Sequence, residues 1–189
     1  MDLTGLAGAL ALVRMRPVLE VAGTPFLAEI DSIVAACGAL ETSGCAKEVR
    51  LLRAWKKEID PVEDAFEPIY FQSAAADLAV LVASQESDVS DREFSIRVTV
   101  GNFWNSCDSL LHARGGYSRA EYKGIKTTPR GVENMWCDRD VFLLSEGRDN
   151  LAKVFAERLS EIYSKYPKRK EIARIIAECG GWDIPANLS

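Results

Sequence analysis

The sequence has few of the residues from which most catalytic and metal sites are built. Histidine occurs once, at His112, and the five cysteines are widely spaced, with no CxxC pair. A histidine-dependent metal cluster or catalytic triad would rest on that one residue, and a structural zinc site is not indicated. No GxxxxGK[ST] loop and no GxGxxG motif occurs. We therefore expect no cofactor, no bound metal and no nucleotide chemistry.

Long apolar runs are also absent. No stretch approaches the roughly 20 apolar residues of a membrane-spanning helix. The most apolar segment, 3–13, is followed by Arg14 and Arg16, whereas the charges of a signal peptide precede its apolar part. The odd number of cysteines fits a reducing compartment better than a disulfide framework. We expect an intracellular, cytoplasmic protein without a transmembrane segment and with reduced cysteines.

Length and composition fit one globular domain covering 1–189. The chain has 189 residues, and a domain usually holds roughly 100 to 200. Hydrophobic residues make up 48% and charged residues 27%, with 7 prolines and 13 glycines. This balance excludes disordered, collagen-like and coiled-coil classes.

Helix signals are frequent. Behind Thr24-Pro25, which predicts an N-cap and a first helical residue, apolar residues recur at three- and four-residue spacing. Similar patterns predict helices over 46–59, 69–84 and 90–115. Alternating apolar residues at 94–100 would also fit a strand, but the longer 3.6-residue period favours a helix.

The rest of the chain completes an all-α prediction. Residues 114–136 have no clear periodicity and predict one long irregular loop that holds a short helix from Ser118. Further helices are expected within 138–181, with a break near Gly147 and a stop at Gly180-Gly181. We therefore predict a single-domain bundle of six to eight helices.

Charge is segregated along this chain, whose net charge is -5. Nine acids and one base lie in 60–93, whereas 47–57, 114–131 and 165–174 hold five bases each. A positive surface is therefore possible on an acidic protein. The basic helix at 47–57 could meet anionic lipid or a partner's acidic face, although a solvated helix face is the simpler explanation.

The basic segment 114–131, RGGYSRAEYKGIKTTPRG, is the best candidate for contact with an anionic partner. Its cations can neutralise phosphates, and its tyrosines can stack on bases. A solvated loop with ordinary surface cations explains the same residues more simply, because nucleic-acid binders are usually basic throughout. The candidate anion- or RNA-binding residues are Arg114, Tyr117, Arg119, Tyr122, Lys123, Lys126 and Arg130.

An alternative catalytic site would use Cys107 and His112, with Asp108 four residues before the histidine. Neighbours on one helix rarely reach triad geometry, so a simple Asp108–His112 surface pair explains them better. The acids of 60–67 have the spacing of a metal site but no Glu-x-x-His partner, and a helix dipole accounts for them. We favour a non-catalytic role, and no small-molecule substrate is indicated.

The run from Asp91 to Tyr122 resembles the long helix and following turn of tobamovirus-type rod-shaped virus coat proteins. The matching residues are Asp91, Ile96, Arg97, Tyr117, Arg119 and Tyr122. Such coats are helical bundles that stack around single-stranded RNA, so the resemblance implies self-assembly and phosphate contacts. Residues 137–189 have no counterpart in that family.

These observations favour a non-enzymatic helical binding or self-assembly module that contacts an anionic partner, with RNA as one candidate. Two alternatives stay open. One is an enzyme with the site centred on Cys107 and His112. The other is a carrier of an apolar or lipid ligand, held between helices by Phe26, Phe103 and Trp104; 24–40 is similar to the first core helix of glycolipid transfer proteins.

Overall fold

The computed structural model of the chain describes residues 2–59, 66–84, 89–115, 128–166 and 169–184. Within these ranges the chain forms eight α-helices, two short 3₁₀ helices and no strand, which confirms the predicted all-α class. In chain order the elements are α1 (Leu3–Val21), α2 (Leu27–Gly38), η1 (Thr42–Cys45), α3 (Ala46–Glu58), α4 (Pro68–Ala83), α5 (Val89–Gly115), α6 (Pro129–Glu146), η2 (Arg148–Asn150), α7 (Leu151–Lys165) and α8 (Arg169–Gly180).

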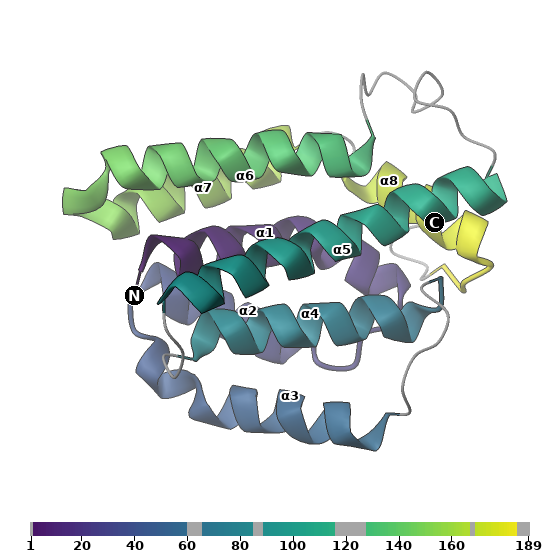
Figure 1. Cartoon of the computed structure of the whole chain (residues 1–189), viewed down its shortest axis with the longest axis horizontal. Helices are drawn as coiled ribbons and strands as arrows, with labels where there is room; N and C mark the ends of the chain where they lie inside the picture. The colour runs from purple at the N-terminus through teal and green to yellow at the C-terminus, as the bar shows by residue number, and fades with distance from the viewer. Residues whose placement is uncertain (1, 60–65, 85–88, 116–127, 167–168, 185–189) are drawn as a thin grey trace.

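Helix α1 lies at the centre of the bundle (Figure 1). It packs against α2, α4, α5, α6, α7 and α8, and 14 of its 19 residues are buried. Apolar residues of α1 occur on every side of the helix, which is typical of a helix that is buried on all sides. The carboxylate of Asp2 caps it by accepting a hydrogen bond from the Gly5 N–H at 2.8 Å. The apolar segment 3–13 is therefore the centre of the core.

All the remaining helices except α3 pack directly against α1. Figure 1 shows α6 and α7 along one edge of the molecule and α3 along the opposite edge, where it packs on α4. One hydrophobic cluster includes buried residues from all eight α-helices. Within it, Phe71 of α4 packs edge-to-face on Phe103 and Trp182, with ring centroids 5.3 and 5.1 Å apart. The bundle thus has one continuous core.

The predicted helix start at Thr24-Pro25 is wrong. Helix α2 begins at Leu27, and its N-cap residue, Phe26, makes no side-chain capping bond. The Thr24 hydroxyl is buried and has no hydrogen-bond partner among the described residues. Here Phe26 is buried and packs against Trp55, so tertiary packing rather than capping determines how the chain enters α2.

The predicted irregular segment 114–136 is wrong at both ends. Helix α5 extends to Gly115, and α6 already begins at Pro129. The Thr128 hydroxyl caps α6 by accepting from the Gly131 N–H at 3.2 Å. Proline suits the first helical position because its missing N–H would have no helical partner there. The short helix expected from Ser118 lies outside the described residues.

Other expected boundaries are confirmed. Helix α5 covers 94–100, so the strand alternative does not hold. Gly147 separates α6 from η2 and α7, as the sequence indicated. At the end of α8, Gly181 adopts a φ of 69°, a conformation that glycine tolerates, and the Trp182 N–H donates back to the Ala177 carbonyl at 2.9 Å.

All five cysteines are free, and Cys37, Cys45 and Cys107 are buried. Burial raises the pKa of the Cys37 thiol to about 12. In the part of the chain that the structure describes, no helix has both the length and the apolar character needed to cross a membrane.

Candidate functional site

The structure describes only the two ends of the predicted RNA-binding segment. Arg114, exposed at the end of α5, places its guanidinium over the Phe66 ring, 5.3 Å from the centroid. Arg130 donates through its guanidinium to Asn105 and through its backbone N–H to Asp108, the latter at 3.3 Å. Both ends thus contact the bundle. The other predicted residues, Tyr117, Arg119, Tyr122, Lys123 and Lys126, lie outside the described residues.

The residues of the alternative catalytic site lie on different sides of α5. Cys107 is fully buried, whereas His112 is exposed. Burial, with a smaller effect of Asp108, raises the pKa of the Cys107 thiol well above its usual value. The thiolate, which is the nucleophilic form, is therefore disfavoured. This geometry does not favour a Cys107-centred nucleophile.

The acidic cluster at 60–67 lies mostly outside the described residues, and its described member Glu67 is exposed. Among the residues that the structure describes, no group of three or more histidine, cysteine and acidic side chains could hold a metal ion.

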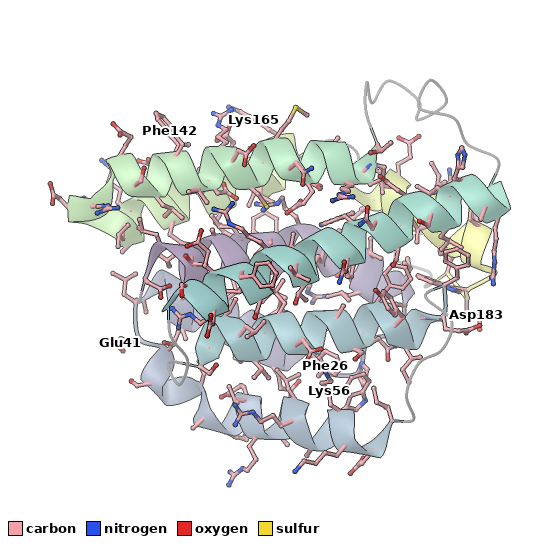
Figure 2. The ribbon with its side chains drawn as sticks, in the orientation of Figure 1. Phe26, Glu41, Lys56, Phe142, Lys165 and Asp183 are labelled. Atoms are coloured by element: carbon pink, nitrogen blue, oxygen red, sulfur yellow. The ribbon has the colours of Figure 1, made fainter. Side chains whose placement is uncertain are left out.

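Helix α3 contacts the bundle through a narrow stripe. Leu52 is its one buried residue, and half-buried Trp55 packs on Phe26, with ring centroids 4.5 Å apart. Lys56 reaches towards α4 (Figure 2) and pairs there with Asp77. The other basic residues of the helix, Lys47, Arg50, Arg53 and Lys57, are exposed. A wide basic face is thus left on the outside of the molecule.

A groove of about 620 Å³ lies along this face, between α3 and the end of α4. Arg50, Arg53 and Lys57 line it from successive turns of α3. We call it the basic groove. Its other lining residues are aliphatic, small or hydroxyl-bearing: Thr42, Ser43, Cys45, Ala46, Val49, Ala54, Ala83 and Ser84. Three cations around one concave surface create a local positive potential.

A larger groove of about 980 Å³ opens beside α1, with walls from α2 and α7. We call it the apolar groove, because most of its lining is aliphatic or aromatic. That lining includes Leu12, Val13, Pro17, Ile30, Val34, Phe155 and Leu159. The small side chains of Ala35, Ala152 and Ala156 leave space between the helices.

The rim of the apolar groove carries a preformed ion cluster. Arg16 donates from Nε and Nη2 to Asp31, both at 3.0 Å, and from Nη1 to Glu20 at 2.9 Å. Two carboxylates thus neutralise this rim cation, which disfavours an anionic ligand here. Phe26, Phe103 and Trp104, which the sequence analysis expected around an apolar ligand, are buried core residues that line neither groove.

A buried ion cluster that the sequence did not predict lies where α1, α6 and α7 meet. Arg14 donates from Nε and Nη2 to Glu133 at 2.7 to 2.9 Å and from Nη1 to Asp140 at 2.5 Å. Arg158 donates from Nε to the same Asp140 at 2.6 Å. None of the four residues is more than 2% exposed. Arg158 also pairs with Glu161, which is less buried, so two cations and three carboxylates meet at this junction.

Neighbouring polar groups complete this cluster. The Tyr166 hydroxyl and the Cys137 thiol each donate to Glu133 at 3.1 Å, and the Arg158 guanidinium lies 4.9 Å from the Trp136 ring centroid. Burial would lower the pKa of Arg14, but its acidic neighbours raise it well above the usual value. Burial and Glu133 raise the pKa of Tyr166. The cluster thus joins three helices through charged and polar side chains.

Comparison of the chain with protein-family models, with curated proteins and with solved structures gives no match. The lining of the two grooves and the charges around them are therefore the features that bear on function.

Proposed function

We propose that this chain is a non-catalytic helical binding module whose partner is anionic. The observation that carries the proposal is the basic groove, where Arg50, Arg53 and Lys57 are exposed around one concave surface. A phosphate or carboxylate entering it would meet several cations, and hydrogen bonds between charged groups are stronger than neutral ones. Because the whole chain has a net charge of -5, this basic surface is a local exception to the acidic charge of the protein.

RNA and self-assembly belong to this proposal on the strength of the sequence. The basic segment from Arg114 to Arg130 combines cations with tyrosines, and the resemblance to coat proteins links such a segment to single-stranded RNA. Self-association would place several copies of both basic surfaces along one polyanion. The test therefore measures anion binding and assembly together.

The test begins with protein purified without nuclease. Size-exclusion chromatography with light scattering and dual-wavelength absorbance, at low and high salt, reports on assembly and bound nucleic acid. Retention on a heparin column then compares the wild type with two variants of equal charge change. The basic-groove variant carries Arg50→Gln, Arg53→Gln and Lys57→Gln, and the control carries Arg148→Gln, Lys153→Gln and Lys165→Gln.

We expect the control to elute near the wild type and the basic-groove variant at clearly lower salt. Equal retention of the wild type and the basic-groove variant would contradict a role for this surface. Co-purifying nucleic acid that salt releases would support RNA as the anion. A monomer with a protein-only spectrum would remove RNA and assembly from the proposal.

The apolar groove favours a second candidate function, carriage of an apolar ligand. Its volume of about 980 Å³ lies near the upper end of ligand pockets, and its lining is mainly apolar. Native mass spectrometry before and after delipidation should then show a mass difference. Ala156→Trp places a large side chain in the groove and should abolish the mass difference. Ala113→Trp changes an exposed residue of α5 outside the groove and should leave the difference unchanged. Identical masses before and after delipidation would exclude a retained ligand.

A further inference from the structure

The basic groove has two chemically distinct sides. Arg50, Arg53 and Lys57 follow one another at spacings of three and four residues, so they share one side of α3 over about 10 Å. The aliphatic and small residues, among them Val49 and Ala54, supply an apolar side. A ligand that fills this groove therefore needs anionic groups in a row and aliphatic groups beside them.

The apolar side favours a peptide over a nucleic acid. None of the eleven described residues that line the groove is aromatic. Single-stranded nucleic acids bind proteins through base stacking on aromatic rings as well as through phosphate contacts. Small aliphatic residues offer no stacking surface, but they pack well against leucine or valine side chains. The lining thus matches an amphipathic helix better than a strand of RNA.

We propose that the basic groove binds an acidic amphipathic helix of a partner protein. Acidic residues at positions i, i+3 and i+7 of that helix face Arg50, Arg53 and Lys57, and aliphatic residues beside them pack on Val49 and Ala54. This is helix-in-groove recognition with charge complementarity. The inference rests on the proposed function and specifies its partner at this site.

The charge distribution of the chain orients such a partner. Helix α3 holds five basic and two acidic residues, whereas the whole chain has a net charge of -5. The charge of α3 is thus opposite in sign to the net charge of the chain, and it attracts an acidic helix and raises the rate of productive encounters.

The test uses a fluorescein-labelled synthetic peptide of at least about 15 residues, long enough to form a helix. It carries glutamate at i, i+3 and i+7 and leucine beside these positions. A second peptide has lysine in place of each glutamate, and a labelled single-stranded RNA is the third probe. Fluorescence anisotropy measures the affinity of the full-length protein for each probe at low and physiological salt.

We expect the acidic peptide to bind and the basic peptide not to bind. The variant with Arg50→Gln, Arg53→Gln and Lys57→Gln should weaken binding about tenfold or more, because several charge-assisted contacts are lost. The control with Arg148→Gln, Lys153→Gln and Lys165→Gln should bind like the wild type. Thermal melts of each variant establish that it is folded.

Ala54→Trp separates groove docking from simple charge attraction. Ala54 is exposed and lines the groove, so an indole there fills the apolar side without changing any charge. We expect this variant to lose peptide binding and to keep its retention on heparin. Unchanged peptide binding by Ala54→Trp, or tighter binding of RNA than of peptide at the groove, would overturn the inference.

The outcomes distinguish this inference from the proposed function. No peptide binding by a wild type that heparin retains overturns the acidic-helix partner and leaves an anion-binding surface. Loss of both peptide binding and heparin retention overturns the inference and the proposed function together.

Discussion

The arginines of the α1–α6–α7 junction and those of α3 are the same chemical group in opposite surroundings. Arg14 and Arg158 are at most 2% exposed and are bonded to carboxylates, whereas Arg50 of α3 is exposed to solvent. A charge withdrawn from water needs a close partner, because leaving it unpaired costs several kcal/mol, whereas a solvated charge needs none. The inner arginines therefore join helices, and the outer ones are accessible to a partner.

This contrast predicts that stability and binding depend on different cations. Substitutions at the junction should lower the free energy of unfolding, and substitutions in the basic groove should lower affinity. The predictions below test whether the two regions separate in this way.

Arg14→Met should have the largest effect on stability. It leaves Glu133 and Asp140 buried without their shared cation, and breaking a buried pair in this way costs about 3–5 kcal/mol. That is a large share of the roughly 5–15 kcal/mol by which domains are stable. Urea denaturation measures the loss, with Arg50→Met as the exposed counterpart, for which we expect almost no change.

Arg14→Lys covers the case in which Arg14→Met does not fold. Lysine keeps the charge but loses the forked geometry with which Arg14 reaches Glu133 and Asp140 together, so its loss of stability should be smaller. The contrast between the two regions would be wrong if Arg14→Met and Arg50→Met had the same free energy of unfolding.

Alkaline pH should destabilise the interior, because its buried thiols resist ionisation. Burial raises the pKa of the Cys37 thiol to about 12, and it also raises the pKa values of Cys107 and Cys137. The pKa of a cysteine thiol in an unfolded chain is about 8.5. Above that pH the folded chain binds more protons than the unfolded chain, so its stability falls as pH rises. Each buried thiol contributes about 1.4 kcal/mol per pH unit.

Denaturation curves across the alkaline range measure this slope. The contribution of these thiols is constant below about pH 8, where they are protonated in both states. Cys107→Ala should make the slope shallower by the share of one thiol. A free energy of unfolding that does not change between about pH 8 and pH 10 would show that the thiols are not protected from ionisation.

Two glycine-to-alanine substitutions compare a tightly packed position with an open one and change no charge. A Cβ at Gly8 of α1 would lie 2.7 Å from Val82 Cγ2, whereas one at Gly101 of α5 would meet nothing within 4 Å. Gly8→Ala should therefore destabilise by about 1–3 kcal/mol through overpacking. Gly101→Ala should stabilise by roughly 0.5–1 kcal/mol, because alanine favours the helix. Thermal melts that shift both variants in the same direction would contradict this assignment.

Much of the fold could be predicted from local sequence patterns, because amphipathic helices such as α3 and α7 have a clear apolar face in the sequence. The central position of α1 could not, since an apolar run on all sides of a helix has no preferred face. Thr128-Pro129 and Thr24-Pro25 are the same dipeptide, and each predicts an N-cap followed by a first helical residue. Only Thr128-Pro129 starts a helix. Local capping preferences are weak enough for tertiary packing to override them.

The candidate sites were less predictable. The basic character of α3 is visible in the sequence, but its groove depends on how α4 ends beside it. The buried cluster was missed because Arg14 joins residues more than a hundred positions away. One signal was available: Glu133 and Asp140 are seven residues apart on one helix face, and Arg14 lies next to an apolar run. Such pairings are fixed by packing, which one sequence does not reveal.

The smallest predicted effect distinguishes two adjacent lysines of α3. Lys56 pairs with Asp77 on α4, so Lys56→Gln should lower stability by about 0.2–1 kcal/mol, the range for an exposed ion pair, with little change in peptide affinity. Lys57 lines the basic groove instead, so Lys57→Gln should weaken the acidic peptide without a measurable change in stability. Both substitutions remove one charge from the same helix turn, so general electrostatics predicts equal effects on binding. A difference in affinity between them would show that position in the groove, and not the charge of α3 alone, selects the partner.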